Sequence, residues 1–465
     1  MIILFVYCGI YAIMINPIFG RHFDEFYKIT GGESHLEWFK EFARFNPLAD
    51  WSYFFLKFLP YGYTSYAYYL QNSFFFVLFI SLAFIFLKFN QSQKASHIYI
   101  KLFILLSLAF CANQMYEIFA NLVYPERTLL VLIILFFIAM RKEQYLNNAL
   151  VKTILFVFAA VVVITATYSK ETAFAIFLVF ALMNFLFIKT LDKREKIFNF
   201  FLILNALVFL ALYYFFIFLK AENNYLQAAQ EVRIRNILDI ILIFYNNPAL
   251  ILVLIFTFVR LYFVLIKKDR NNIFSDSLLF SIAGYALTFI LLGFTHNYYY
   301  SITIVLGLIL LCPYILKFYD EKKFVIVWTI LLFIFICSLA GMRQIKDDFL
   351  RRYDIGSTFV YNVLKVDMLT KYGREIVYTN EDIIFENYLY YVNSNKYDPK
   401  FLSLNEPENP NVFVRRIDTA QKPLYPKAVY ISGANLPKEN ENFKDFVEIA
   451  SWRGRHAFIH KDELK

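Results

Sequence analysis

The chain has 465 residues, of which 59% are hydrophobic and only 18% are charged, and its formal net charge is +9. A soluble domain is about 45–50% apolar and about 25% charged, so this composition excludes an ordinary soluble protein. Repeated apolar runs are about 20 residues long, which is the length that crosses a bilayer. We therefore expect an all-α polytopic membrane protein in contact with a lipid bilayer, and we expect no nucleic-acid partner.

The apolar runs predict about eleven transmembrane helices in a domain that covers residues 1–342. The first run lacks the basic segment and the small-residue cleavage site of a signal peptide, so it is interpreted as a retained span. The predicted spans are 2–19, 72–90, 98–114, 126–141, 151–168, 172–189, 198–219, 247–266, 276–295, 300–317 and 323–342.

Lysine and arginine concentrate in alternate short loops, which predicts the orientation in the membrane. These loops carry Lys88, Lys94, Arg141, Lys142, Lys152, Lys189, Lys193, Arg194, Lys196, Lys267, Lys268, Arg270, Lys317, Lys322 and Lys323. The positive-inside rule places them in the cytoplasm together with the N-terminus. Residues 20–71 and 343–465 are then outside, which is the periplasm if the membrane is a bacterial inner membrane. The lumen of the endoplasmic reticulum is topologically equivalent.

The first outer loop, residues 20–71, is too long for a simple connector, and long loops are usually functional. Its Ser34-x-x-Glu37 pattern is typical of a capping box at the start of an amphipathic helix, and a second aromatic stretch follows. Both stretches are expected to lie flat in the outer interface. Asp24 and Glu25 stand at the membrane–water boundary, where carboxylates are costly unless they are used.

The tail, residues 343–465, has a different character, because short alternating runs are separated by turn residues. We predict a small extracytoplasmic α/β domain of about 120 residues, which is within the usual domain range. A helix is expected over Asp347–Thr370. The expected strands are Glu375–Tyr378, Asn411–Arg415, Lys427–Ser432 and Phe446–Ala450.

Ionisable residues gather at the outer ends of the predicted spans. They are Asp24, Glu25, Glu126, Arg127, Lys170, Glu171, Arg233, Arg235 and His296. Charges at membrane depth usually face a cavity or a partner, so they predict a cavity that opens outward. A carboxylate there is able to act as a general base for an acceptor hydroxyl, and fixed cations are able to stabilise a phosphate leaving group.

Several short motifs, taken in order, resemble a known class of enzymes. They are the Asp24-Glu25 pair with Tyr27, Glu126 before a Leu-rich span that ends in Arg141-Lys142, the turn Lys170-Glu171-Thr172, and the aromatic run from Tyr298. This order, together with the terminal outer domain, is similar to the GT-C class of integral-membrane glycosyltransferases, which use polyprenyl-phosphate sugars as donors. The resemblance covers the layout of the whole chain, although each motif is short.

The resemblance implies a role for each of the outer residues. Asp24, and with it Glu25, is implied as the catalytic base or the carboxylate that orients the acceptor, while Lys170 and Arg127 are implied to hold the donor phosphate. Further cavity candidates are Glu126, Glu171, Tyr27, His296, Tyr298, Arg233 and Arg235. Many relatives have Arg before the late Tyr, whereas this chain has His296-Asn297, and a neutral imidazole would not hold a phosphate.

The implied partners are a polyprenyl-phosphate-linked sugar and an acceptor that is a glycan, a lipid or a protein. No metal triad of the Asp-x-Asp type is evident, so neither a metal nor a cofactor is invoked.

Three other classes stay open. A polysaccharide polymerase or ligase also uses lipid-linked glycans, but it would be expected to carry its catalysts in a large late outer loop. A lipid-linked glycan flippase or other transporter would favour inverted repeats and broken helices. A structural assembly subunit would tolerate replacement of Asp24 at no functional cost.

Overall fold

The computed structural model of the protein describes a defined part of the chain. The described residues are 45–49, 51–54, 65–88, 94–112, 115–120, 125–143, 148–187, 191–220, 237–269, 272–294, 297–354, 376–379, 414–417, 429–432, 444–452 and 455–463. The chain divides into two compact units, the first built mainly on residues 71–346 and the second containing residues 347–465. The predicted first span, 2–19, and most of the first outer loop lie outside the described residues.

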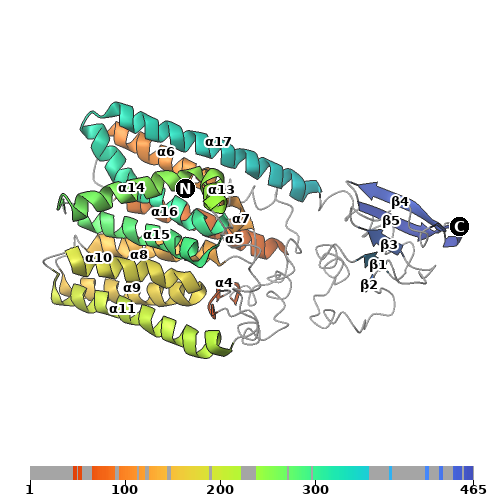
Figure 1. Ribbon diagram of the computed structural model, residues 1–465, viewed down its shortest axis with the longest axis horizontal. Helices are drawn as coiled ribbons and strands as arrows, with labels where there is room; N and C mark the ends of the chain where they lie inside the picture. The colour runs from red at the N-terminus through yellow and green to blue at the C-terminus, as the bar shows by residue number, and fades with distance from the viewer. Residues whose placement is uncertain are drawn as a thin grey trace. The chain divides into compact units, whose positions relative to one another are not determined.

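The described part of the first unit is helical (Figure 1). Its helices are α4 (Trp51–Phe54), α5 (Ser65–Lys88), α6 (Ala95–Cys111), α7 (Met115–Ala120), α8 (Glu126–Glu143), α9 (Ala149–Ser169), α10 (Phe174–Phe187), α11 (Lys193–Leu212), α13 (Ile237–Asn246), α14 (Pro248–Leu265), α15 (Ile273–Leu292), α16 (Tyr298–Asp320) and α17 (Phe324–Asp354). Short helical turns of other types follow α9 at η2 (Glu171–Ala173) and α11 at η3 (Tyr213–Ile217) and η4 (Phe218–Lys220).

Seven of the described helices are long and apolar enough to cross a membrane, namely α5, α9, α11, α14, α15, α16 and α17. Two shorter apolar helices, Ser96–Cys111 and Glu171–Phe187, lie among them. Helix α8 is apolar in its middle but carries charges at both ends. The expectation of a helical membrane protein is therefore confirmed, while the count of eleven spans stays a prediction.

Local sequence signals explain where several helices begin and end. Asp192 and Glu195 form a capping box at the start of α11, so the first backbone amides of that helix are satisfied. Helix α14 begins with Pro248, whose fixed φ and missing N–H suit the first helical position. Helix α15 ends at Gly293, which adopts φ 80°, a left-handed conformation that glycine reaches at little cost.

Burial separates a central helix from peripheral ones. In α16, 83% of the most apolar stretch is buried, whereas the corresponding shares are 28% in α9 and 22% in the helix that contains α11. Helix α16 contacts α6, α14 and α15, while α11 packs on α9 and α10 (Figure 1). The exposed faces of α9 and α11 are rich in Phe, Leu, Ile and Val, as expected for helices that face lipid.

The described part of the second unit contains a five-stranded sheet. Its strands are β1 (Ile376–Thr379), β2 (Val414–Ile417), β3 (Val429–Ser432), β4 (Phe446–Trp452) and β5 (Arg455–His460), in the order β2-β1-β3-β5-β4. Strands β1, β2 and β3 are parallel, and β5 is antiparallel to both β3 and β4. Parallel neighbours need a crossover connection. The connecting residues lie outside the described part, so the predicted α/β domain as a whole stays a prediction.

Two differences from the predicted elements concern this region. Strand β5 was not predicted, because its run is short and separated from β4 by two residues only. Helix α17 continues without interruption from Phe324 to Asp354, across the predicted boundary between residues 342 and 343. The later part of the expected helix Asp347–Thr370 lies beyond the described residues.

Candidate functional site

Helix α9 makes contacts at both of its ends, near Ala149 and near Ser169, and these contacts define two groups of residues. At the end called here the basic end, Arg194 Nη1 donates to the Ala149 carbonyl oxygen at 2.6 Å. At the opposite end, called here the Glu126 end, the Leu48 amide donates to the Tyr168 carbonyl oxygen at 3.0 Å. Lys152 and Asp192, which pair at 3.6 Å, also lie at the basic end, while Glu126 and Lys170, which were predicted to be outer residues, lie at the Glu126 end.

A buried ion pair forms the centre of the Glu126 end. Lys170 Nζ lies 2.7 Å from Glu126 Oε1, and the two side chains are only 5% and 1% exposed. Lys170 follows the last residue of α9 in an extended conformation, which ends that helix and directs the chain into the short turn η2. Glu126 is the first residue of α8, where the helix dipole favours a negative charge.

Aromatic and hydroxyl groups surround this ion pair. Lys170 Nζ lies 5.3 Å from the centre of the Tyr299 ring, within the range of a cation–π contact. Tyr285 is completely buried on helix α15, which contacts the turn η2 that follows Lys170. Among the described residues, Glu126 Oε2, the Tyr285 hydroxyl and the Thr172 hydroxyl are buried without a fully formed hydrogen bond. These buried polar atoms therefore have no hydrogen bond within the part of the chain that the structure describes.

Arg127 is completely buried but makes contacts of a different kind. Its guanidinium carbon lies 4.1 Å from the centre of the Tyr53 ring, and Nη2 donates to Ser52 Oγ at 3.4 Å. Neighbouring residues on a helix do not face the same side, which explains why Arg127 and Glu126 have different surroundings. Arg127 thus holds the start of α8 against helix α4, which belongs to the predicted first outer loop.

The segment that precedes α4 packs beside Lys170. The Phe45 ring lies 5.9 Å from that of Tyr168 and 5.8 Å from that of Phe209. Ser169 Oγ donates to the Leu48 carbonyl oxygen at 3.1 Å. An apolar, aromatic cover of this kind excludes water and strengthens electrostatic interactions beneath it.

The structure therefore brings some of the predicted site residues together. Lys170 and Glu126 are in contact, Glu171 is half-buried in the adjoining turn, and the Tyr298 ring lies 4.1 Å from that of Tyr299. Arg127 lies at the same end but contacts Tyr53 instead. The predicted residues Asp24, Glu25, Tyr27, Arg233, Arg235 and His296 lie outside the described residues, so their placement stays a prediction.

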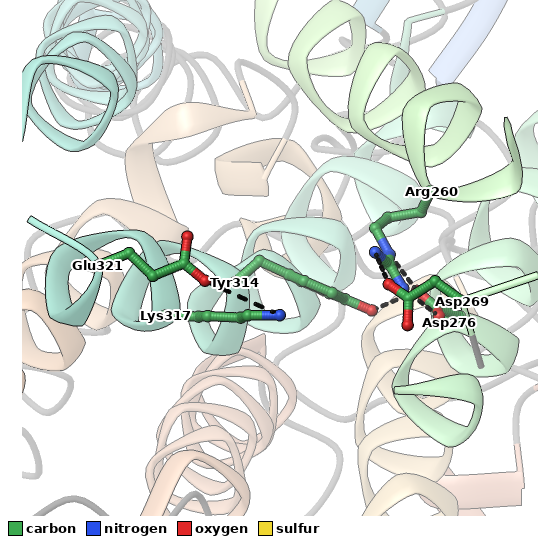
Figure 2. Close-up of polar contacts among 6 residues, drawn as sticks. All are labelled: Arg260, Asp269, Asp276, Tyr314, Lys317 and Glu321. Atoms are coloured by element: carbon green, nitrogen blue, oxygen red, sulfur yellow. Dashed lines mark hydrogen bonds and ion pairs between the residues drawn. The ribbon is translucent and has the colours of Figure 1, made fainter. Parts of the chain in front are cut away.

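A second buried polar group, at the basic end, was not anticipated (Figure 2). Arg260 donates from Nε and Nη2 to the two oxygens of Asp276, both at 2.8 Å, and from Nη1 to Asp269 Oδ2 at 3.3 Å. The Tyr314 hydroxyl donates to Asp276 Oδ1. We call these four residues the Arg260 cluster. The signal in the sequence was an arginine inside one apolar run and an aspartate at the start of the next.

The Arg260 cluster differs chemically from the ion pair at the Glu126 end. Both oxygens of Asp276 accept hydrogen bonds, and the guanidinium forks onto the carboxylate in the geometry that arginine favours. The cluster joins α14, α15 and α16 through contacts that satisfy one another. We therefore interpret the cluster as a structural contact that stabilises the packing of these three helices.

No group of three or more His, Cys, Asp or Glu side chains is placed to hold a metal ion within the part of the chain that the structure describes. Comparison with protein-family models, curated proteins and solved structures found no match to this chain.

Proposed function

We propose that the chain is a membrane glycosyltransferase that moves a sugar from a polyprenyl-phosphate donor to an acceptor at the outer face of the membrane. The acceptor is a glycan, a lipid or a protein, and the expected location is a bacterial inner membrane with the site facing the periplasm. The observation that carries the proposal is the buried Lys170 at the end of the helical unit opposite the basic loops. A lysine is costly to bury in a membrane protein unless it serves an anion or a partner.

The proposed reaction is a direct displacement at the anomeric carbon of the donor sugar. Asp24 accepts the proton of the acceptor hydroxyl while the acceptor oxygen forms its bond to that carbon. The bond from the anomeric carbon to the phosphate oxygen breaks, and polyprenyl phosphate leaves with the electron pair. Lys170 stabilises the leaving phosphate, which gains negative charge as the bond breaks. Glu25 is proposed to orient the acceptor, and the configuration of the sugar is inverted.

The position of Lys170 suits this role for a physical reason. The phosphate of a lipid-linked donor lies at the depth of the membrane interface, and Lys170 stands where α9 ends. Its ammonium group lies against the Tyr299 ring, and the aromatic Phe45 packs on the nearby Tyr168. A fixed cation in such a water-poor place contributes more to the transition state than to the bound donor.

The test is sugar transfer by the purified protein from a radiolabelled polyprenyl-phosphate sugar. Asp24→Asn keeps the shape of the side chain but removes the proton acceptor, so we expect transfer to fall about a hundredfold or more. Lys170→Ala should lower the rate at saturating donor, and Lys170→Arg should restore part of it because the charge is kept. Glu25→Gln serves as the companion variant that decides which carboxylate is the base.

Each outcome has a clear meaning. If Asp24→Asn and Glu25→Gln both transfer sugar at the wild-type rate, the enzyme assignment is wrong. If the protein moves a lipid-linked glycan across the bilayer of a vesicle without forming a new glycosidic bond, it is a flippase. Extension of a glycan by repeated addition of blocks would instead identify a polymerase or ligase.

A further inference from the structure

Two asparagines that precede neighbouring helices contact each other. Asn247 directly precedes α14, and Asn297 directly precedes α16. Asn247 Nδ2 donates to Asn297 Oδ1 at 2.8 Å and to the Ile243 carbonyl oxygen at 2.9 Å. The side-chain amide has two hydrogens, so both are used and the orientation of the Asn247 amide is fixed. We call Asn247 and Asn297 the asparagine pair.

Neither asparagine has the usual role of its position. An asparagine just before a helix normally accepts a hydrogen bond from a free amide of the first turn. Neither side chain of the pair does so, in α14 or in α16. Asn247 is only 2% exposed, and its Oδ1 is buried without a hydrogen bond among the described residues. A buried acceptor of this kind costs free energy until a donor reaches it, and the hydroxyl group of a ligand is such a donor.

The asparagine pair lies beside the ion pair of Lys170. Asn297 is two residues before Tyr299, and the centre of the Tyr299 ring lies 5.3 Å from Lys170 Nζ. Two residues of the chain span at most about 7 Å. A sugar that is bonded to a phosphate at Lys170 is therefore within reach of the asparagine pair.

A second amide pair shows that an unpaired oxygen alone does not define a site. Asn184 Nδ2 donates to Asn199 Oδ1 at 3.0 Å, and Asn184 Oδ1 is also buried without a hydrogen bond within the described ranges. Asn184 lies near the end of α10, and Asn199 lies near the start of α11, which begins beside Asp192 at the basic end. The two pairs therefore differ in their position relative to Lys170, and Asn184 provides a matched control.

We propose that the asparagine pair binds a hydroxyl group of the donor sugar, whose hydrogen is accepted by Asn247 Oδ1. This inference rests on the proposed function, and it names a contact that decides which sugar is transferred. A sugar hydroxyl both donates and accepts, and the Nδ2 hydrogens of Asn297 are the remaining donors of the pair. A sugar that lacks this hydroxyl leaves Asn247 Oδ1 buried and unpaired, so it is rejected.

The experiment measures binding to the full-length protein in detergent micelles. The probes are farnesyl phosphate, its esters with glucose, galactose, mannose and arabinose, and the free methyl glycosides of these sugars, with farnesol as the uncharged control. We expect at least one ester to bind about tenfold more tightly than farnesyl phosphate, because its hydroxyl satisfies a buried acceptor. Deoxy forms of that ester then identify the hydroxyl whose removal abolishes the gain.

Asn247→Leu removes the acceptor and keeps a branched side chain of similar length. In this variant the ester and its deoxy form should bind equally, while the affinity for farnesyl phosphate stays unchanged. A purely structural role of Asn247 would instead weaken the binding of all probes alike and preserve the preference for the ester over its deoxy form. Asn184→Leu should bind every probe as the wild-type protein does. Thermal unfolding checks that each variant is folded.

The outcomes separate this inference from the proposed function. If the wild-type protein binds farnesyl phosphate no better than farnesol, the phosphate site at Lys170 is wrong, and the sugar contact falls with it. If farnesyl phosphate binds better than farnesol but no ester exceeds it, only the sugar contact is wrong. The same holds if folded Asn247→Leu keeps the full preference for the ester over its deoxy form.

Two further results are also decisive. If Asn247→Leu loses affinity for a free methyl glycoside and for none of the esters, the hydroxyl belongs to the acceptor, and its assignment to the donor is wrong. If Asn247→Leu does not fold, Asn297→Ala decides, because an unchanged preference for the ester over its deoxy form in that variant rejects the asparagine pair as the sugar contact.

Discussion

At the scale of single residues, the two buried charged groups differ in how completely their carboxylate oxygens are hydrogen-bonded. In the Arg260 cluster, both oxygens of Asp276 are hydrogen-bonded, and three helices share the contacts. In the pair of Glu126 and Lys170, one carboxylate oxygen has no donor among the described residues. A fully satisfied buried network makes the structure around it more rigid, so the Arg260 cluster is expected to contribute to stability.

The Arg260 cluster leads to a prediction about stability. Asp276→Asn removes the charge that balances the buried guanidinium, so we expect the free energy of unfolding to fall by about 3 kcal/mol or more. Tyr314→Phe removes only one hydrogen bond and should cost about 1 kcal/mol. Unfolding of the purified protein in detergent, followed by circular dichroism, measures both changes. If the two variants lose the same free energy of unfolding, the ion pair does not stabilise the packing of these helices more than one hydrogen bond does.

At the scale of helices, α6 and α17 approach each other closely at a glycine. A Cβ atom added at Gly341 of α17 would lie 1.7 Å from the Phe110 carbonyl oxygen of α6. The same interface includes Cys111 Sγ, which lies 3.0 Å from Ser338 Oγ. Small residues allow helices in membranes to approach closely, and here the neighbouring atom is backbone, which cannot rotate away.

Gly341→Ala should therefore separate α6 from α17. Overpacking in a core usually costs about 1–3 kcal/mol, and we expect a loss near or above the upper end because no flexible side chain is able to yield. Gly284→Ala is the matched control, since its Cβ would lie 3.0 Å from Val179 Cγ2, which belongs to a side chain. Thermal unfolding in detergent compares the two. A loss for Gly341→Ala no larger than for the control would contradict this close contact.

At the scale of the whole molecule, the distribution of lysine and arginine predicts the orientation in the membrane. The described loops at the basic end carry cations, including Lys193, Lys267 and Lys323, and the positive-inside rule places this end in the cytoplasm. The Glu126 end and residues 343–465 are then expected outside.

Labelling with a membrane-impermeant thiol reagent tests this orientation in whole cells. In a variant whose four native cysteines are replaced, Ser432→Cys should react in intact cells, and Lys193→Cys should react only after the membrane is opened. The reason is that β3, which contains Ser432, belongs to the predicted outer domain. Labelling of the two positions in the reverse order would overturn the orientation and the mechanism that depends on it.

The sequence by itself determined where most elements lie. Ten of the eleven predicted apolar runs coincide with described helices, and four alternating runs overlap strands β1 to β4, although the overlap with β2 is only Val414 and Arg415. This success has a local cause, because the length of an apolar run and the alternation of side chains are properties of neighbouring residues. The proposal that Lys170 serves a site also came from local placement, in a short turn at the end of a predicted span.

Only the tertiary structure decided which residues meet. Lys170 forms an ion pair with Glu126, which is 44 positions away in the sequence, while Arg127 turns toward Tyr53. The central position of α16 was equally hidden, since a helix that is apolar on all sides shows no stripe that distinguishes protein from lipid. Such contacts depend on how the helices pack against one another, and no pattern along one helix encodes that packing.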